Sequence, residues 1–165
     1  PGVTSPCRRA RMPDMDIDHR AIAVATYNET WELIDRPDRT AADDRDMLGR
    51  ALTSRYHWQI AGDPRHHAIS DWQVSRVCSL IGEAGLARTF ADAAMDLCQA
   101  HDLDAFVTGC AEEALARALW VGGDARAARA VITSARRVWA TLDEGDERQV
   151  LGADLDELEG WLATS

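Results

Sequence analysis

A group of histidines and an aspartate around one short turn carries the most reactive chemistry in the sequence. His57 lies five residues before Gly62, and His67 and Asp71 follow the turn with a spacing of four. In an antiparallel helical hairpin, residues equally far from the turn face each other, which brings His57 level with His67. His67 and Asp71 share one helical face. Because imidazole and carboxylate groups are good ligands for divalent metals, His57, His67 and Asp71 form a candidate metal site.

The competing interpretation of these residues is structural. Histidines at the end of a helical hairpin often serve as half-buried packing groups that bond free carbonyl oxygens. The sequence lacks an intact HExxH motif, a recognisable nucleophile motif around Ser or Cys, and a glycine-rich phosphate loop. The sequence therefore leaves open whether the protein is an enzyme, and it implies no cofactor other than that metal ion.

The turn itself predicts where one helix ends and the next begins. Gly62 is expected to take the left-handed conformation of a helix C-terminus, Asp63 to cap the next helix, and Pro64 to occupy its first turn. Trp58 and Trp72 flank this hairpin, and they would form the walls of a pocket if His57, His67 and Asp71 are the centre of a ligand-binding or catalytic site.

Apolar residues recur with helical spacing along most of the chain, and strict alternation typical of strands is missing. The pattern predicts an all-α fold of six to seven helices, arranged as antiparallel hairpins in one domain over residues 16–163. Residues 1–15 are expected to form a flexible tail. The first predicted helix starts near residue 16 or 18 and ends near 35, and the others span about 40–61, 63–81, 86–101, 104–121, 125–142 and 147–163. The largest side chains of the expected core are Trp31, Trp58, Trp72, Phe90, Phe106, Leu115, Ile132 and Trp139.

An internal repeat links two of the predicted turns. The segments 82–87 and 122–128 lie 40 residues apart, and each one ends a helix and opens the next. Small residues then recur at a spacing of seven, Ala87 with Ala94 and Ala128 with Ala135, which is typical of closely packed helices. In these features the chain resembles the long-helix variants of the tetratricopeptide-repeat (TPR) superfamily. Segments 54–58 and 71–77 are similar to uncharacterised bacterial TPR-like proteins.

The resemblance implies a short TPR-like solenoid that acts as a protein or peptide interaction module. Stacked hairpins place the first helix of each pair along a groove, here the first, third and fifth helices. The candidate groove residues are Asn28, Glu32, Trp58, Trp72, Gln73, Arg76 and Glu113. The alternative is a small-molecule-binding or metal-binding protein, or a small enzyme, with the histidine-rich turn as its site. Homo-oligomerisation is compatible with either function.

Charge narrows the range of partners. The formal net charge is −10, and all 18 basic residues are arginine. Such an acidic protein is predicted to avoid nucleic acid and anionic membranes and to prefer a basic partner. The lack of lysine is typical of a GC-rich bacterial genome. With no run of 18 apolar residues, no secretory pattern and no C-x-x-C pair, we expect a cytoplasmic protein with buried, reduced cysteines.

Overall fold

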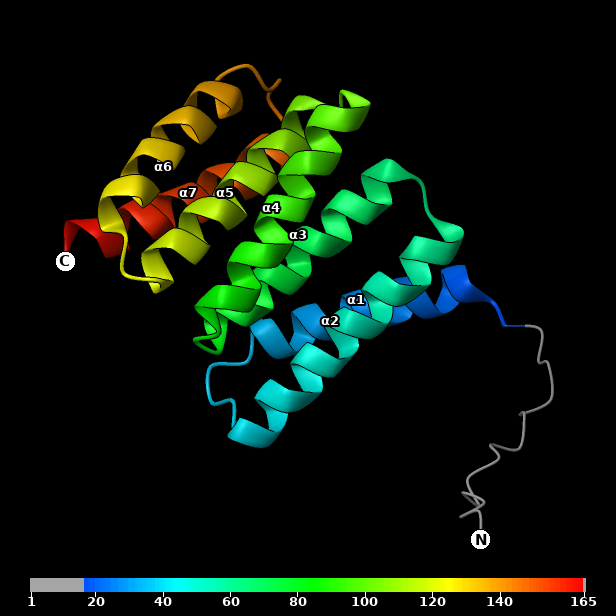
Figure 1. Ribbon diagram of the computed structural model, residues 1–165. Helices are drawn as coiled ribbons and strands as arrows, with labels where there is room; N and C mark the ends of the chain where they lie inside the picture. Colours follow the sequence, from blue (N-terminus) through cyan, green and yellow to red (C-terminus); the bar gives the residue numbers. More distant parts are fainter. Residues whose placement is uncertain (1–16, 165) are drawn as a thin grey trace, which may run out of the picture.

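The computed structural model describes residues 17–164, and this part of the chain is entirely helical, without strands (Figure 1). The prediction of an all-α fold is confirmed, and the predicted tail over residues 1–15 lies outside the described residues. The seven helices are α1 (His19–Ile34), α2 (Ala41–Ala61), α3 (Pro64–Leu80), α4 (Ala84–His101), α5 (Ala105–Val121), α6 (Ala125–Trp139) and α7 (Asp146–Ala163).

Consecutive helices pack as hairpins. The most extensive contacts join α1 to α2, α3 to α4 and α5 to α6, and the hairpins then stack through α2 with α3 and α4 with α5. The first helices of the second and third hairpins, α3 and α5, also pack against each other. α7 packs against α5 and α6 (Figure 1).

Polar caps fix where several helices begin. Asp18, Asp104 and Asp124 each accept a hydrogen bond from the backbone amide three residues later. Thr40 and Asp43 form a reciprocal capping box at the start of α2, as their spacing suggests. These caps explain why α2, α5 and α6 start within one residue of the predicted positions, and why α1 starts next to the later of its two predicted positions.

Gly62 does not have the predicted left-handed conformation. Its backbone is extended, with φ −98° and ψ 178°. A Cβ atom at this position would lie 2.7 Å from both the Cβ atom of His66 and the carbonyl oxygen of Trp58. The glycine is therefore required by the close approach of α2 and α3, and not by a positive φ angle.

The repeated turns are built alike. Gly82 and Gly123 both have positive φ angles, 80° and 86°. In both turns the following amide, from Glu83 or Asp124, donates to the carbonyl oxygen five residues before it. The equivalent glycines are thus 41 residues apart, one more than the sequence alignment suggested. An offset of 41 also superimposes the fully buried pairs Ala87 with Ala128 and Ala94 with Ala135.

The expected core is confirmed in part. Trp58, Trp72 and Ile132 are buried, whereas Trp31, Phe90, Phe106, Leu115 and Trp139 are half-buried and pack against the core from its edge. Much of the fully buried interior consists of alanine, which lets helices approach closely. Large side chains are consequently displaced towards the grooves between helices.

α7 docks tightly through small residues. Its buried leucines, Leu151, Leu155, Leu158 and Leu162, face the core. A Cβ atom on Gly109 of α5 would stand 2.4 Å from Leu151, and one on Gly152 of α7 would stand 3.0 Å from Trp139. The last helix is therefore an integral part of the folded domain.

Two further expectations concern the thiols and membranes. Cys78, Cys98 and Cys110 are buried and unpaired with one another, as predicted, and burial raises the pKa of the Cys78 thiol to about 11. None of the helices within residues 17–164 combines the length and apolar character that crossing a membrane requires.

Candidate functional site

The three predicted metal ligands each have a different partner. His57 lies beside His19 of α1, with 2.7 Å between their Nδ1 atoms. His67 Nε2 donates to the carbonyl oxygen of Trp58 at 3.1 Å. Asp71 is 2% exposed and forms an ion pair with Arg55. Of these three contacts, only the bond from His67 to a carbonyl oxygen is of the kind that the structural interpretation describes.

No group of three or more His, Cys, Asp or Glu side chains within residues 17–164 is arranged to hold a metal ion. The His19–His57 pair is instead a contact between the first two helices. Partial burial and the neighbouring His19 ring lower the pKa of His57. At a separation of 2.7 Å, one Nδ1 atom donates a hydrogen bond and the other accepts it.

A cavity of about 520 Å³ lies along the first helices of the hairpins. We call it the aromatic groove. It is lined by residues from α1, α3, α5 and α7: Tyr27, Trp31, Arg65, Ile69, Trp72, Phe106, Glu147 and Val150. The volume falls within the range of 300–1,000 Å³ typical of ligand sites, as does a mainly apolar lining with few polar groups.

Ring packing fixes the shape of the aromatic groove. Trp31 meets Tyr27 edge-on at a centroid separation of 6.3 Å and lies against Trp72, tilted, at 5.6 Å. Tyr27 and Trp31 are four residues apart on α1, so one helical face presents both. Burial raises the pKa of Tyr27, which keeps its hydroxyl group neutral.

The side chain of Trp72 is hydrogen-bonded to a buried ionic network. The Trp72 indole donates to Glu113 Oε2 at 2.9 Å, and Arg117 donates to Glu113 Oε1 at 2.7 Å. Arg117 and Arg76 then reach α7, where they bond Glu157 at 2.9 Å and Asp154 at 2.7 Å. The network thus connects the wall of the groove to the last helix.

Electrostatics in this network favour the charged form of Glu113. Burial acts to raise its pKa, but Arg117 and Arg76 outweigh that effect and leave the pKa lowered. Burial and the nearby Glu113 raise the pKa of Asp154. Arg117 Nη1 and Arg76 Nε are buried without a hydrogen-bond acceptor among the described residues.

The predicted groove residues are only partly brought together. Trp72 lines the aromatic groove, and Trp58 lines an adjoining cavity of about 170 Å³ that shares Tyr27, Arg65 and Ile69 with it. The two tryptophans therefore line two neighbouring cavities. Neither His57, His67 nor Asp71 lines these two cavities.

The remaining predicted groove residues lie elsewhere. Gln73 is buried and donates to the carbonyl oxygen of Tyr27, while Arg76 and Glu113 belong to the ionic network. Asn28 and Glu32 are exposed on α1 and line neither cavity. The expectation that Asn28 faces inwards is wrong, because Tyr27 and Trp31 occupy the inner face of that helix.

Sequence reasoning missed most of the lining. The missed lining residues include three pairs at helical spacing: Tyr27 and Trp31 in the second half of α1, Arg65 and Ile69 at the start of α3, and Glu147 and Val150 at the start of α7. Their position on alternate helices could have predicted that they line one groove. That prediction requires α7 to be counted as a fourth lining helix.

A third cavity, of about 580 Å³, continues the aromatic groove at the N-terminal ends of α5 and α7. We call it the acidic pocket. It is lined by Arg65, by residues 104–106 at the start of α5, and by residues 141–147 between α6 and α7. It shares Arg65, Phe106 and Glu147 with the aromatic groove.

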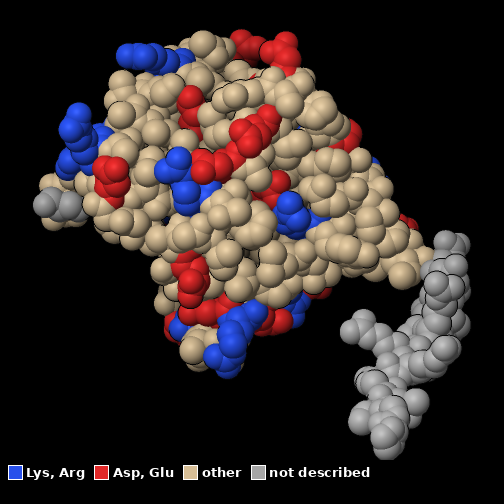
Figure 2. All heavy atoms as spheres, in the orientation of Figure 1, with Lys and Arg blue, Asp and Glu red and all other residues tan. Residues whose placement is uncertain are grey.

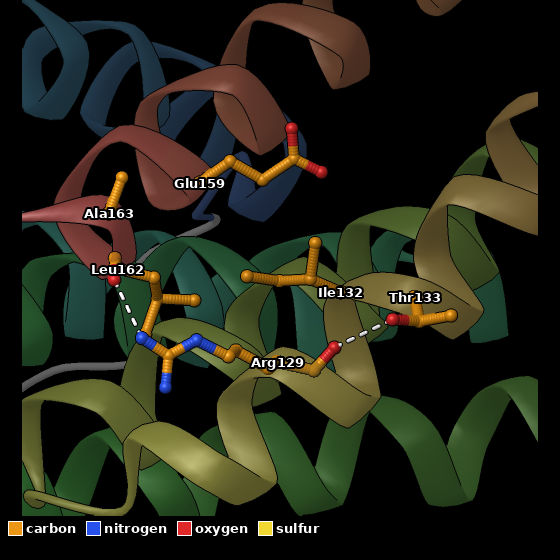
Figure 3. A pocket seen from close by; sticks show the side chains of 6 residues that line it. All are labelled: Arg129, Ile132, Thr133, Glu159, Leu162 and Ala163. Carbon is orange, nitrogen blue, oxygen red and sulfur yellow. Dashed lines mark hydrogen bonds between the residues drawn. The ribbon is translucent and has the colours of Figure 1, made fainter.

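Another crevice, of about 560 Å³, opens between α6 and α7 near the end of the chain (Figure 3). Its polar groups already have partners. Arg129 crosses the crevice to donate to the Leu162 carbonyl oxygen at 2.7 Å, and the Thr133 hydroxyl donates to the Arg129 carbonyl at 2.9 Å. Glu159 pairs with Arg136. We therefore assign this crevice to helix packing.

Charges of both signs are scattered over the face of the molecule seen in Figure 2, separated by wide uncharged areas. In comparisons with family models, curated proteins and solved structures, nothing matches this chain. The candidate site therefore rests on geometry: an aromatic groove that continues into an acidic pocket.

Proposed function

We propose that this protein is a TPR-like interaction module that binds a segment of a partner protein in the aromatic groove. The observation that carries the proposal is the convergence of Tyr27, Trp31, Trp72 and Phe106 from three separate helices on one open cavity. Aromatic side chains supply large contact areas with little loss of conformational freedom, and they dominate many binding sites.

The lining supports a protein segment as the occupant. The groove runs across α1, α3, α5 and α7 and adjoins a cavity at each of two borders, one near Trp58 and one at the acidic pocket. An extended or helical peptide can cross several such compartments with successive side chains. Net charge −10 favours a basic partner and faster association with it.

The test is selection of peptides on the folded protein. Random dodecapeptides displayed on phage are selected on immobilised protein, and the most enriched sequence is synthesised and titrated into ¹⁵N-labelled protein. We expect the indole signals of Trp31 and Trp72 to shift, while that of Trp139, outside the groove, stays in place.

A matched pair of variants checks the site of binding. Val150→Asp puts a charge into the groove at a side chain that is 49% exposed, and Leu52→Asp makes a comparable change on α2, where Leu52 is 41% exposed. We expect Val150→Asp to weaken binding at least about fivefold and Leu52→Asp less than about twofold. Equal effects of both variants would contradict the proposed site.

A small-molecule-binding function is the second candidate, and the cavity volume of about 520 Å³ is the observation in its favour. Native mass spectrometry of the freshly purified protein distinguishes the two. A bound compound of low molecular mass that is lost in Val150→Asp and retained in Leu52→Asp would favour this alternative.

A further inference from the structure

The acidic pocket differs in charge from the aromatic groove that it continues. One cation, Arg65, faces five carboxylates in its lining: Asp104, Asp143, Glu144, Asp146 and Glu147. Arg65 bonds Asp104 at 2.9 Å and Glu147 at 3.3 Å, so its charge is already shared between two of them.

The three other carboxylates are only weakly compensated. Glu144 approaches Arg148 at 3.5 Å, and its side chain is 91% exposed. Within residues 17–164, Asp143 and Asp146 have no ion-pair partner. The pocket therefore has an excess of negative charge that no cation of the described chain neutralises.

The negative charge of the acidic pocket lies next to the aromatic groove, where a ligand bound in the groove can reach it. Phe106 and Glu147 border both the aromatic groove and the acidic pocket, so a chain bound in one cavity can place a neighbouring residue in the other. An apolar side chain gains by leaving water in the aromatic groove. A neighbouring cationic side chain gains by pairing with Asp143 and Asp146.

We infer that the occupant of the site is a segment in which a large apolar side chain is followed closely by arginine or lysine. This inference rests on the proposed function. The apolar side chain enters the aromatic groove, and the basic one pairs with Asp143 and Asp146. The aromatic groove provides the anchor, and the acidic pocket selects which anchored sequences are retained.

The overall charge of −10 would also attract any basic peptide, so the test must separate local from global electrostatics. The variant Asp143→Asn/Asp146→Asn removes two charges from the acidic pocket. Its matched control, Asp38→Asn/Asp96→Asn, removes two exposed charges from the α1–α2 turn and from α4. Both proteins have the same net charge, and their melting temperatures verify that each is folded.

The probes are acetylated and amidated hexapeptides, measured by isothermal titration calorimetry at low salt. Ala-Trp-Ala-Arg-Arg-Ala carries both features, Ala-Trp-Ala-Glu-Glu-Ala reverses the charge, and Ala-Ala-Ala-Arg-Arg-Ala lacks the anchor. We expect the first to bind tightest to the wild type. Asp143→Asn/Asp146→Asn should weaken it about three- to tenfold, and the control double variant less than about twofold.

The possible results separate this inference from the proposed function. In one outcome the first peptide binds and Val150→Asp weakens its binding, but the two double variants bind it equally well. That outcome overturns the selection for basic residues by the acidic pocket and leaves the proposed binding in the aromatic groove intact. If the anchorless peptide binds as well as the first, or if no probe binds at millimolar concentration, the inference and the use of the groove for such segments both fail.

Discussion

Gly109 of α5 lies directly against Leu151 of α7, so close that a Cβ atom on the glycine would stand 2.4 Å from Leu151 Cδ2. Leu151 is itself 1% exposed, which leaves its side chain little room to move. This single contact sets how closely the last helix approaches the hairpin formed by α5 and α6. It also makes the position sensitive to one added methyl group.

Gly109→Ala is expected to destabilise the protein by about 1–3 kcal/mol, because the added carbon overpacks the α5–α7 contact. Gly49→Ala is the matched control. It makes the same change in α2, where a Cβ atom would meet nothing within 4 Å. Better helix propensity should stabilise that variant by up to about 1 kcal/mol. Urea denaturation measures both, and a stabilised Gly109→Ala variant would contradict the close contact.

Glu113→Gln should cost about 3–5 kcal/mol, because it keeps the shape of the side chain but removes the buried counter-charge of Arg117, which then has only the 44% exposed Glu157 as an ion-pair partner. Glu112→Gln is the control, since the amide can still accept the hydrogen bond from Ser134. Its cost should stay below about 1 kcal/mol. Comparable stability losses in the two variants would show that the charge of Glu113 is unimportant.

The His19–His57 contact makes stability depend on pH. The pKa of His57 is lowered from its ordinary value of 6.5 in the folded protein, so the unfolded chain binds the proton first as pH falls. Stability should therefore decrease as pH falls below about 7, until the lower folded-state pKa is passed.

Thermal unfolding between pH 7.5 and 5.5 measures this dependence. The variant His57→Gln should flatten it, whereas His101→Gln, at an exposed position of α4, should leave the slope as in the wild type. If stability depends on pH as steeply in His57→Gln as in the wild type, His57 is not the source of the pH dependence.

Zinc tests the remaining metal hypothesis. We expect Zn²⁺, added without chelator at pH 7.5, to leave the melting temperature unchanged, because His57, His67 and Asp71 bond three different groups. A ligand that binds only the folded state would raise that temperature by mass action. A zinc-dependent rise that His57→Ala abolishes would restore the metal site.

The fold was predictable because its signals are local. Asp18, Thr40, Asp63, Asp104 and Asp124 precede helical apolar patterns, and each caps a helix through a contact within three residues. The equivalence of the Gly82 and Gly123 turns also follows from short segments. The conformation of Gly62 was predicted wrongly, because glycine is required there by close contacts across the turn with Trp58 and His66.

The site was harder to predict because it depends on which face each helix turns towards its neighbours. On α1, Asn28 and Tyr27 are adjacent in sequence, and only packing decides that Tyr27 points into the groove. Arg76 and Glu113 were expected in the groove because they are polar on an inner helix. Instead, Arg76 pairs with Asp154 and Glu113 pairs with Arg117. Asp154 lies on α7, 78 residues further along the chain than Arg76.

The docking of α7 has a consequence for the order in which the site is made during synthesis. Glu147 and Val150 form part of the groove, and Asp146 part of the acidic pocket, so the wall they provide is translated after all six preceding helices. A nascent chain that ends after α6 lacks this wall of the groove and the buried leucines of α7. Under the proposed function, partner binding therefore requires chains whose translation has passed the seventh helix.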